Sequence, residues 1–196
     1  MRKVILLKIY FEDLNNCSDD FDCWYSMLSH NKKSRIDRIK DNHKKKILIL
    51  SDHLARLSVS DFTGISQLEI SFSYNSHGKP ILPQGTPHFN VSHSGDYVVC
   101  CISDKPCGID IEVIREVNLN SAKRFCTENE LNYINSSQNK NVALLYIWTR
   151  KEAYFKSVGC GIATILSSVD VLKTDGFKTT VTDKYVLSTF ELSKND

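Results

Sequence analysis

The chain has 196 residues, of which 41% are hydrophobic and 24% charged, and its formal net charge is +2. This balance is typical of a globular protein and argues against intrinsic disorder, and the length allows one large domain or two small ones. Apolar runs such as Val4–Leu7 and Ile47–Leu50 are too short to cross a bilayer. The apolar start of the chain contains Lys8 and lacks the cleavage site of a signal peptide, so we expect a cytoplasmic protein without membrane contact.

The first half of the chain begins with a predicted strand at Val4–Tyr10, which a polar loop follows. Apolar residues then recur with a helical period from about Ser34 to Leu57. This pattern predicts one long amphipathic helix, which is broken at Asp61 and Gly64.

Basic residues and cysteines are distributed in ways that bear on possible ligands. Residues 31–46 hold eight Lys or Arg against two Asp, and such a block either binds an anionic ligand or forms a solvated face. The seven cysteines have no metal-ligand spacing and no CxxC pair. We therefore expect free, non-catalytic thiols.

Short extended segments occupy the middle of the chain. Leu68–Phe72 is predicted to be a strand, and residues 80–87 form an irregular stretch that is rich in proline. Val98–Ile102 and Cys107–Val113 are predicted strands on either side of a compact turn. We place the domain boundary in this turn, at Lys105.

The second half starts with a short predicted helix near Asn120–Phe125. Thr127 and Glu130 have the spacing of a capping box, which marks the start of another helix, and a long helix is predicted at Val142–Val158. Three antiparallel strands complete the half: Val169–Leu172, Phe177–Val181 and Tyr185–Leu192. Residues 1–104 and 105–196 thus each carry a long helix and several strands, although the sequence contains no repeat.

Two acidic side chains on one predicted strand are the first chemical signal. Asp110 and Glu112 point the same way, because residues two apart on a strand share a face. Their mutual repulsion is relieved by a divalent cation, and Mg²⁺ is typically held by one or two carboxylates together with substrate phosphates. The alternative is a strand whose solvent-facing side is merely acidic.

A second signal is the helix face that carries Trp148, Glu152 and Lys156, which are spaced four residues apart. The alternative is a simple exposed Glu–Lys pair, which this spacing also allows. Ser92 and His93 are neighbours on an extended segment and face opposite ways, and the chain has no G-x-S-x-G element. These two residues therefore do not indicate a serine hydrolase.

Together these motifs resemble the 4′-phosphopantetheinyl transferase superfamily, in its larger, Sfp-type class. The signature of that family is G-[IV]-D, followed some forty residues later by [FW]-[SCT]-x-K-E-[AS]-x-x-K. Here Gly108-Ile109-Asp110 precedes WTRKEAYFK at 148–156. GKP at 78–80 and FNVSHS at 89–94 also match, so the resemblance extends from about Lys32 to Gly161.

The resemblance implies an α+β pseudo-dimer, in which each of two similar halves packs a small antiparallel sheet on a long helix. It implies an enzyme that transfers the 4′-phosphopantetheine arm of coenzyme A to a serine of an apo-carrier protein (acyl, peptidyl or polyketide carrier) and releases 3′,5′-ADP. A monomer suffices, because one chain supplies both halves. Nucleic acid and membrane are not expected partners.

The resemblance also implies roles for individual residues. Asp110, Glu112 and Glu152 would hold Mg²⁺, with Mn²⁺ as an alternative, and Lys156 would neutralise the phosphates. Glu130 matches a glutamate proposed as the general base in the family, and Glu152 is the other possible base. Coenzyme A would contact a set of mostly basic residues: Lys32, Arg35, Lys79, Ser92, His93, Lys151 and Lys156. In one departure, Ile47 stands where larger members place a further arginine.

Two other kinds of protein would carry some of these features. A module that binds polyanions would use residues 31–46 and would make the carboxylates incidental, and its binding would depend steeply on salt. A catalytically inactive relative would lack Asp110, Glu152 or Lys156, whereas all three are present.

Overall fold

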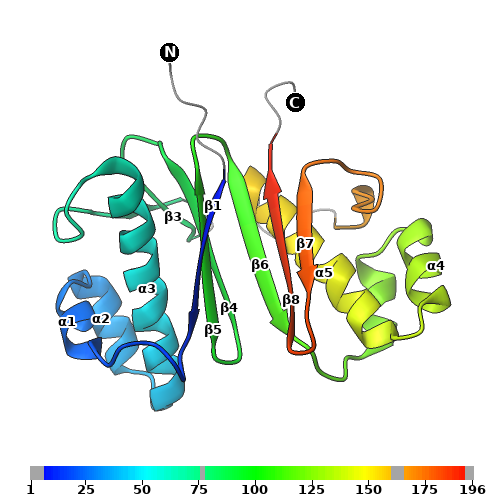
Figure 1. Cartoon of the computed structure of the whole chain (residues 1–196), viewed down its shortest axis with the longest axis horizontal. Coiled ribbons are helices and arrows are strands. Elements are labelled where there is room, and N and C mark those ends of the chain that lie inside the picture. The colour runs from blue at the N-terminus through cyan, green and yellow to red at the C-terminus, as the bar shows by residue number, and fades with distance from the viewer. Residues whose placement is uncertain (1–6, 76–77, 160–165, 193–196) are drawn as a thin grey trace.

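The computed structural model describes residues 7–75, 78–159 and 166–192 (Figure 1). In chain order the elements are β1 (Lys8–Asp13), α1 (Phe21–Ser26), α2 (His30–Asp37), α3 (Asn42–Thr63), β2 (Ser73–Tyr74), β3 (Pro80–Ile81), β4 (His88–Ser94), β5 (Tyr97–Ser103), β6 (Cys107–Val113), the 3₁₀ helix η1 (Leu119–Arg124), α4 (Glu128–Ser136), α5 (Lys140–Val158), the 3₁₀ helix η2 (Leu166–Ser168), β7 (Phe177–Val181) and β8 (Tyr185–Glu191).

Two antiparallel sheets of three strands, each packed on a long helix, form the centre of the molecule. Their strand orders are β1-β5-β4 and β6-β8-β7. Figure 1 shows the sheets side by side, with α3 flanking the first and α5 flanking the second. The expected α+β fold with two halves is therefore confirmed. The turn between β5 and β6 connects the two sheets, and a domain division at Lys105 stays a prediction.

Side chains, not a backbone ladder, join the two sheets where β4 lies next to β6. The backbone N–H of Ile109 donates to Oδ1 of Asn90 at 3.0 Å, and the N–H of Val113 donates to Oγ of Ser94 at 3.1 Å. Because the numbering increases together along both strands, β4 and β6 run parallel. Polar residues of β4 thus satisfy the backbone of β6, which would otherwise be a buried and unpaired strand edge.

The apolar cores lie on both faces of β5. Cys100 belongs to the core that α3 covers, whereas Cys101 packs with Cys107 and Ile109 of β6. All of these side chains are fully buried. Successive side chains of a strand point to opposite faces. β5 therefore contributes to the core of its own half with one face and to the junction with the other half with the other face.

The predicted basic helix is in fact two helices. Residues 38–41 interrupt the helical pattern, and α3 starts afresh because the carboxylate of Asp41 accepts a hydrogen bond from the N–H of Lys44 at 3.2 Å. Gly64 ends α3 with a φ of +77°, a conformation that glycine adopts without strain. Periodicity alone did not show the break, because Ile36 and Ile47 fit the same face of a single continuous helix.

Several strand predictions were wrong or shifted. Leu68–Phe72 and Val169–Leu172 form turns and irregular structure, and the extended pair in the first of these regions is β2, one residue later. β1 extends to Asp13, whereas residues 4–6 of the predicted first strand lie outside the described residues. The predicted polar loop after β1 is present, and α1, which the sequence did not predict, follows it and buries Trp24 against the first core.

Other elements agree with the prediction. β6 and β7 have the predicted bounds, and α4 begins with the expected capping box between Thr127 and Glu130. Six of the cysteines are free thiols in the structure, and Cys160 lies outside the described residues.

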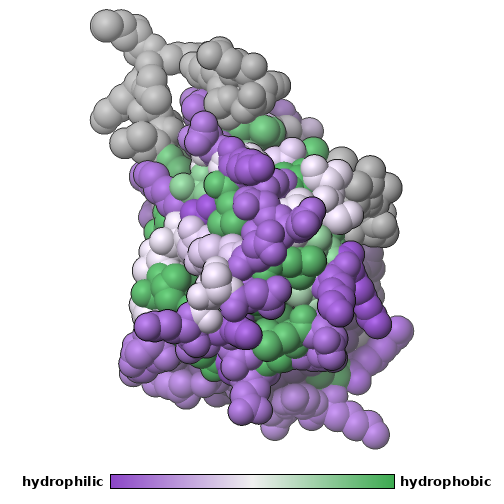
Figure 2. All heavy atoms as spheres, turned by 90° about the vertical axis from the view of Figure 1, so that its right-hand side faces the viewer, coloured by the Kyte–Doolittle hydropathy of each residue, from purple (hydrophilic) through white to green (hydrophobic). Residues whose placement is uncertain are grey.

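The surface on the right-hand side of Figure 1 is mainly hydrophilic, with small hydrophobic patches between the polar side chains (Figure 2). Within the described parts of the chain, no helix has both the length and the apolar character needed to span a bilayer.

Gly108 allows β6 to approach α5 closely. A Cβ atom at this position would lie 1.9 Å from the carbonyl oxygen of Ala153, which is backbone and cannot turn away. We predict that Gly108→Ala lowers the free energy of unfolding by about 3 kcal/mol, at the upper end of the range for overpacked cores. Urea denaturation measures this loss.

Gly64→Ala is the control, because a Cβ there meets no atom within 4 Å and only the positive φ opposes it. Its expected cost is about 1 kcal/mol. Equal losses for the two variants would show that the contact between β6 and α5 does not restrict position 108.

Candidate active site at the junction of the two sheets

Asp110, in the middle of β6, is the centre of a polar cluster at the junction. Its Oδ1 accepts hydrogen bonds from Oγ of Ser92 at 2.7 Å and from Nζ of Lys156 at 2.6 Å. Its side chain is buried, and burial raises its pKa, although Lys156 acts in the opposite direction. A strand of each half and a helix thus meet at one carboxylate.

Lys156 lies on the last turns of α5 and reaches both strands. Besides Asp110, its ammonium group contacts Oγ of Ser92 at 3.0 Å and the carbonyl oxygen of Ile109 at 3.3 Å. Glu152 precedes Lys156 by four residues and therefore faces the same way, as the sequence predicted. The structure thus brings Ser92, Asp110, Glu152 and Lys156 together.

Two carboxylate oxygens in this cluster have no hydrogen-bond partner among the residues that the structure describes. Oδ2 of Asp110 and Oε1 of Glu152 are buried and make no hydrogen bond. Burial raises the pKa of Glu152 to about 7, with nearby Lys156 lowering it and Asp110 raising it further. Buried polar atoms are nearly always paired, so these two oxygens have the capacity to accept from a donor or to bind a cation.

Glu112 lies two residues further along β6 but is already paired. Its Oε2 accepts from Nη1 of Arg115 at 2.7 Å and from Oγ of Ser94 at 2.9 Å. Ser92 and Ser94 of β4 therefore face Asp110 and Glu112 of β6 as two matched pairs. Ser94 and Arg115 were not predicted, although the i, i+2 spacing of the two serines matches that of the two acids.

The carboxylates fit a magnesium ion held by two protein side chains better than one held by three. The described residues contain no group of three or more His, Cys, Asp or Glu side chains arranged around a metal position. Asp110 and Glu152 each have a free buried oxygen, and Glu112, whose Oε2 is bound to Arg115 and Ser94, has no hydrogen bond on its Oε1 among the described residues. Mg²⁺ commonly uses one or two carboxylates together with substrate phosphates, so the residues present are compatible with it.

Lys79 links a neighbouring loop to this cluster. Its ammonium donates to the carbonyl oxygen of Lys156, and burial lowers its pKa. Gly78 and Pro80, on either side of Lys79, line a cavity of about 650 Å³. The loop therefore connects the cluster around Asp110 with that cavity.

Lys32 and Arg35 of α2 line the same cavity, together with Tyr74. The ammonium of Lys32 is 2.8 Å from the buried carboxylate of Asp52, which also binds Arg56 at 2.6 Å. Arg35 makes no ion pair with a residue that the structure describes. Of the predicted basic pair, Arg35 is therefore the more available for an anionic ligand.

Desolvation, and next the positive charge of Lys156, lower the pKa of His93, so this side chain lies within electrostatic range of the cluster. His93 is exposed on the face of β4 opposite to buried Ser92, as expected for adjacent residues of a strand. Ile47 is buried in the first core. Lys46, beside it, lies over the ring of Phe21.

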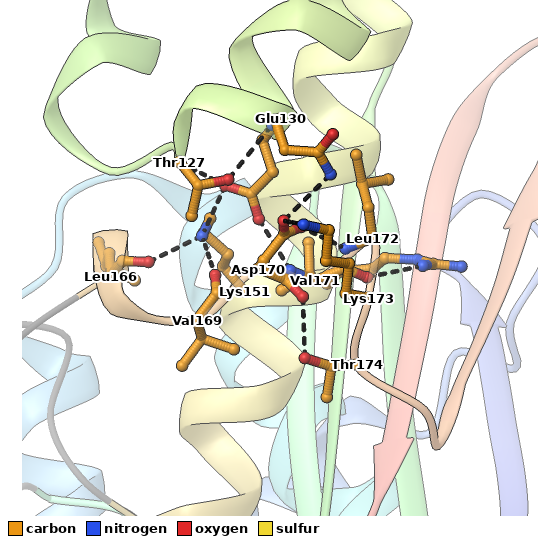
Figure 3. Close-up of polar contacts among 12 residues, drawn as sticks. Thr127, Glu130, Lys151, Leu166, Val169, Asp170, Val171, Leu172, Lys173 and Thr174 are labelled. Atoms are coloured by element: carbon orange, nitrogen blue, oxygen red, sulfur yellow. Dashed lines mark hydrogen bonds and ion pairs between the residues drawn. The ribbon is translucent and has the colours of Figure 1, made fainter.

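The placements expected for Glu130 and Lys151 need correction. Neither side chain is exposed, and the two form an ion pair of 2.8 Å (Figure 3). Figure 3 shows this pair between α4, α5 and the segment from Leu166 to Thr174. Sequence spacing could not reveal that Lys151 points into the second half, away from the coenzyme pocket expected for it.

Comparison with known proteins gives matches over almost the whole chain. Residues 106–194 match the family model of the 4′-phosphopantetheinyl transferase superfamily, and residues 13–105 match that of the 4′-phosphopantetheinyl transferase N-terminal region. The chain is 31% identical to the 4′-phosphopantetheinyl transferase ffp of Bacillus subtilis over 176 residues, which cover 87% of this chain and 79% of that protein.

Two further relatives have the same description. The 4′-phosphopantetheinyl transferase Sfp of Bacillus subtilis (strain 168) is 30% identical over 176 residues, with 87% of this chain and 79% of the relative covered. The 4′-phosphopantetheinyl transferase gsp of Aneurinibacillus migulanus is 37% identical over 136 residues, which are 68% of this chain and 56% of that protein.

The free oxygens of the cluster predict that its acids destabilise the ligand-free protein. Glu152→Gln should raise the free energy of unfolding by about 1 kcal/mol, because an amide removes the buried negative charge beside Asp110. For a chain of this length that corresponds to a rise of roughly 2–4 °C in melting temperature, measured by calorimetry in the presence of a metal chelator.

Glu112→Gln is the matched control. Glu112 is ion-paired with Arg115, so its loss should leave the melting temperature unchanged or slightly lower. A lower melting temperature for Glu152→Gln would show that the Glu152 carboxylate is already satisfied in the ligand-free protein.

Proposed function

This chain belongs to the 4′-phosphopantetheinyl transferase superfamily, and we propose that its junction site carries out the reaction of that family. The enzyme transfers the 4′-phosphopantetheine arm of coenzyme A to a serine of an apo-carrier protein and releases 3′,5′-ADP. The observation that carries the site assignment is the cluster of Asp110, Glu152 and Lys156, with one free buried oxygen on each acid, at the junction of the two halves.

Asp110 and Glu152 are proposed to hold Mg²⁺, or Mn²⁺, through those free oxygens. The bound ion would stabilise negative charge on the pyrophosphate of coenzyme A. Glu112 lies nearby on β6, but its ion pair with Arg115 makes it the weakest of the three predicted ligands. Ser92 orients Asp110 by donating a hydrogen bond to its other oxygen.

Lys156 is proposed to neutralise the phosphates that react. Its ammonium is held in place by Ser92 and Asp110 and is about a quarter exposed, so it can also contact a bound ligand. Lys79 is the second cation on this side, since its ammonium lies against the carbonyl oxygen of Lys156. A phosphoryl transfer site depends mainly on such positioned charges.

The serine of the carrier protein is a poor nucleophile at neutral pH, so a carboxylate must take its proton, directly or through water. Glu130 and Glu152 were the two acids expected to do this. Glu130 is fully buried and bonded to Lys151, and it cannot reach a substrate. We therefore assign the proton transfer to Glu152.

The cavity beside α2 is proposed to bind the nucleotide end of coenzyme A. Arg35 supplies a cation with no partner among the described side chains, and Lys32 adds a second one that Asp52 holds in place. Tyr74 provides an exposed aromatic ring in the same cavity. His93 is exposed near the junction and is the remaining predicted contact to the nucleotide end.

Each half contributes residues to the site, so a monomer is sufficient for activity. A cytoplasmic location would give the enzyme access to both coenzyme A and carrier proteins. The pathway that the carrier serves, whether acyl, peptidyl or polyketide, is decided by the carrier proteins that the enzyme modifies.

The direct test is intact-mass spectrometry of apo acyl and peptidyl carrier proteins incubated with the enzyme, coenzyme A and Mg²⁺. We predict the gain of one phosphopantetheine group on the carrier and a fall of about 100-fold or more in rate for Asp110→Asn, because a charge that supports the transition state is lost. Glu112→Gln should retain more activity, since Glu112 is already paired with Arg115.

Two results would contradict this proposal. Absence of the added group on every carrier, combined with binding of polyanions that falls steeply with salt, would indicate a binding module instead. A wild-type rate for Asp110→Asn would remove Asp110 from the reaction.

The cavity beside α2 predicts which basic residue recognises the 3′-phosphate. Arg35→Ala should lower kcat/KM for coenzyme A by about 10–100-fold, the range for loss of a charge-assisted hydrogen bond. Lys32→Ala should have a smaller effect, since Lys32 already neutralises Asp52. The comparison is steady-state kinetics with coenzyme A and with dephospho-coenzyme A, which lacks this phosphate.

For Arg35→Ala the rate with dephospho-coenzyme A should change little. Equal losses with both donors would mean that Arg35 serves the carrier protein or the fold, and not the 3′-phosphate.

A further inference from the structure

We propose that the buried Glu130–Lys151 ion pair positions Glu152 by fixing the rotation of α5 about its axis, and that Glu130 is not the general base. This inference rests on the proposed function, because it assigns a role to Glu152 in the transfer reaction. Glu152 on α5 thus acts on the reacting atoms, whereas Glu130 on α4 holds α5 in place.

All the hydrogen-bond donors of the Lys151 ammonium group have acceptors inside the protein. It contacts Oε2 of Glu130 at 2.8 Å, the carbonyl oxygen of Leu166 at 2.7 Å and the carbonyl oxygen of Val169 at 2.6 Å. An ammonium has three N–H donors, so these three acceptors leave none for a ligand. Lys151 is therefore fastened to α4 and to the segment that follows η2.

Both carboxylate oxygens of Glu130 also have partners inside the protein. Its Oε2 also accepts from the N–H of Thr127 at 2.7 Å, which closes the capping box of α4, and its Oε1 accepts from the N–H of Val171 at 2.8 Å. The side chain has no exposed surface. A general base must come within hydrogen-bond reach of the proton that it removes, and Glu130 does not meet this condition.

Lys151 and Glu152 are adjacent on α5, so their side chains leave the helix about 100° apart. Lys151 points to α4 and the segment after η2, and Glu152 faces the side of Lys156 and Asp110. Rotation of α5 that moved Glu152 away from Asp110 would have to break the three contacts of Lys151.

Arg150 strengthens the same attachment, since its Nη1 donates to the carbonyl oxygen of Val171 at 2.9 Å. Two successive residues of α5 thus hold one short segment, from Leu166 to Val171, against the helix (Figure 3). Small displacements of reacting groups have large effects on rate, so a fixed helix rotation matters for catalysis.

The test compares Glu130→Gln, Lys151→Met and the double variant with the wild type in the carrier transfer assay. Glu128→Gln is the matched control, because Glu128 is an exposed acid on the same turn of α4. We measure kcat and KM for coenzyme A, the dependence of kcat on pH, and the melting temperature of each protein.

We expect each single variant to lower kcat about tenfold, with KM within about twofold and an unchanged shape of the pH profile. The double variant should be no worse than the poorer single variant, in both kcat and melting temperature, because the two residues act as one unit. Glu128→Gln should behave as the wild type.

A different pattern would overturn the proposal. If Glu130 is the base, Glu130→Gln should lower kcat by about 100-fold or more and abolish the acidic limb of the pH profile, whereas Lys151→Met should not. If no wild-type transfer is observed, the proposed function fails, and the melting temperatures of the double-variant cycle still test the coupling of the pair.

If Glu130→Gln and Lys151→Met fail to fold, the kcat of Asn129→Ala tests the proposal instead. Asn129 is exposed on α4 and donates to Oδ2 of Asp170 at 3.0 Å, so it holds the same segment without touching the ion pair. A twofold to threefold lower kcat at unchanged KM supports the proposal, and an unchanged kcat contradicts it.

Discussion

The contact between β4 and β6 is the constraint on which the rest of the structure depends. Two small sheets meet there without a backbone ladder between them, and side chains of β4 supply the hydrogen bonds that the backbone of β6 needs. The residues that do this are small and polar, so the junction combines these buried polar groups with the apolar core that Ile109 and Ile111 of β6 join. Asp110 can lie in it only because Ser92 and Lys156 compensate its charge.

Two buried groups of charges in the second half are built in contrasting ways. Around Glu130 and Lys151, every donor of the ammonium has an acceptor, and the group connects two helices to the segment after η2. Around Asp110 and Glu152, one oxygen of each acid is left unpaired. A complete hydrogen-bond network stabilises one arrangement, whereas an incomplete one leaves capacity for a ligand. We therefore assign a positioning role to Glu130 and Lys151, and the reaction to Asp110 and Glu152.

Much of the fold could be predicted because its signals are local. The capping box of Thr127 and Glu130, the strand at Cys107–Val113 and the glycine that ends α3 each depend on residues close in the chain. The predictions that were wrong involve competition with distant residues. Leu68–Phe72 alternates like a strand, but it forms irregular structure near Arg56, whose guanidinium donates to the carbonyl oxygen of Ile70.

The sequence by itself determined the family motifs, the two acids on one face of a strand, and the shared helix face of Glu152 and Lys156, because these follow from spacing within single elements. Only the tertiary structure decided which charged residues meet. It turned Lys151 inward to Glu130, paired Lys32 with Asp52, and placed Lys156 against Asp110. Such choices depend on the burial of each charge and on partners from elements far apart in the chain, and neither property is contained in local spacing.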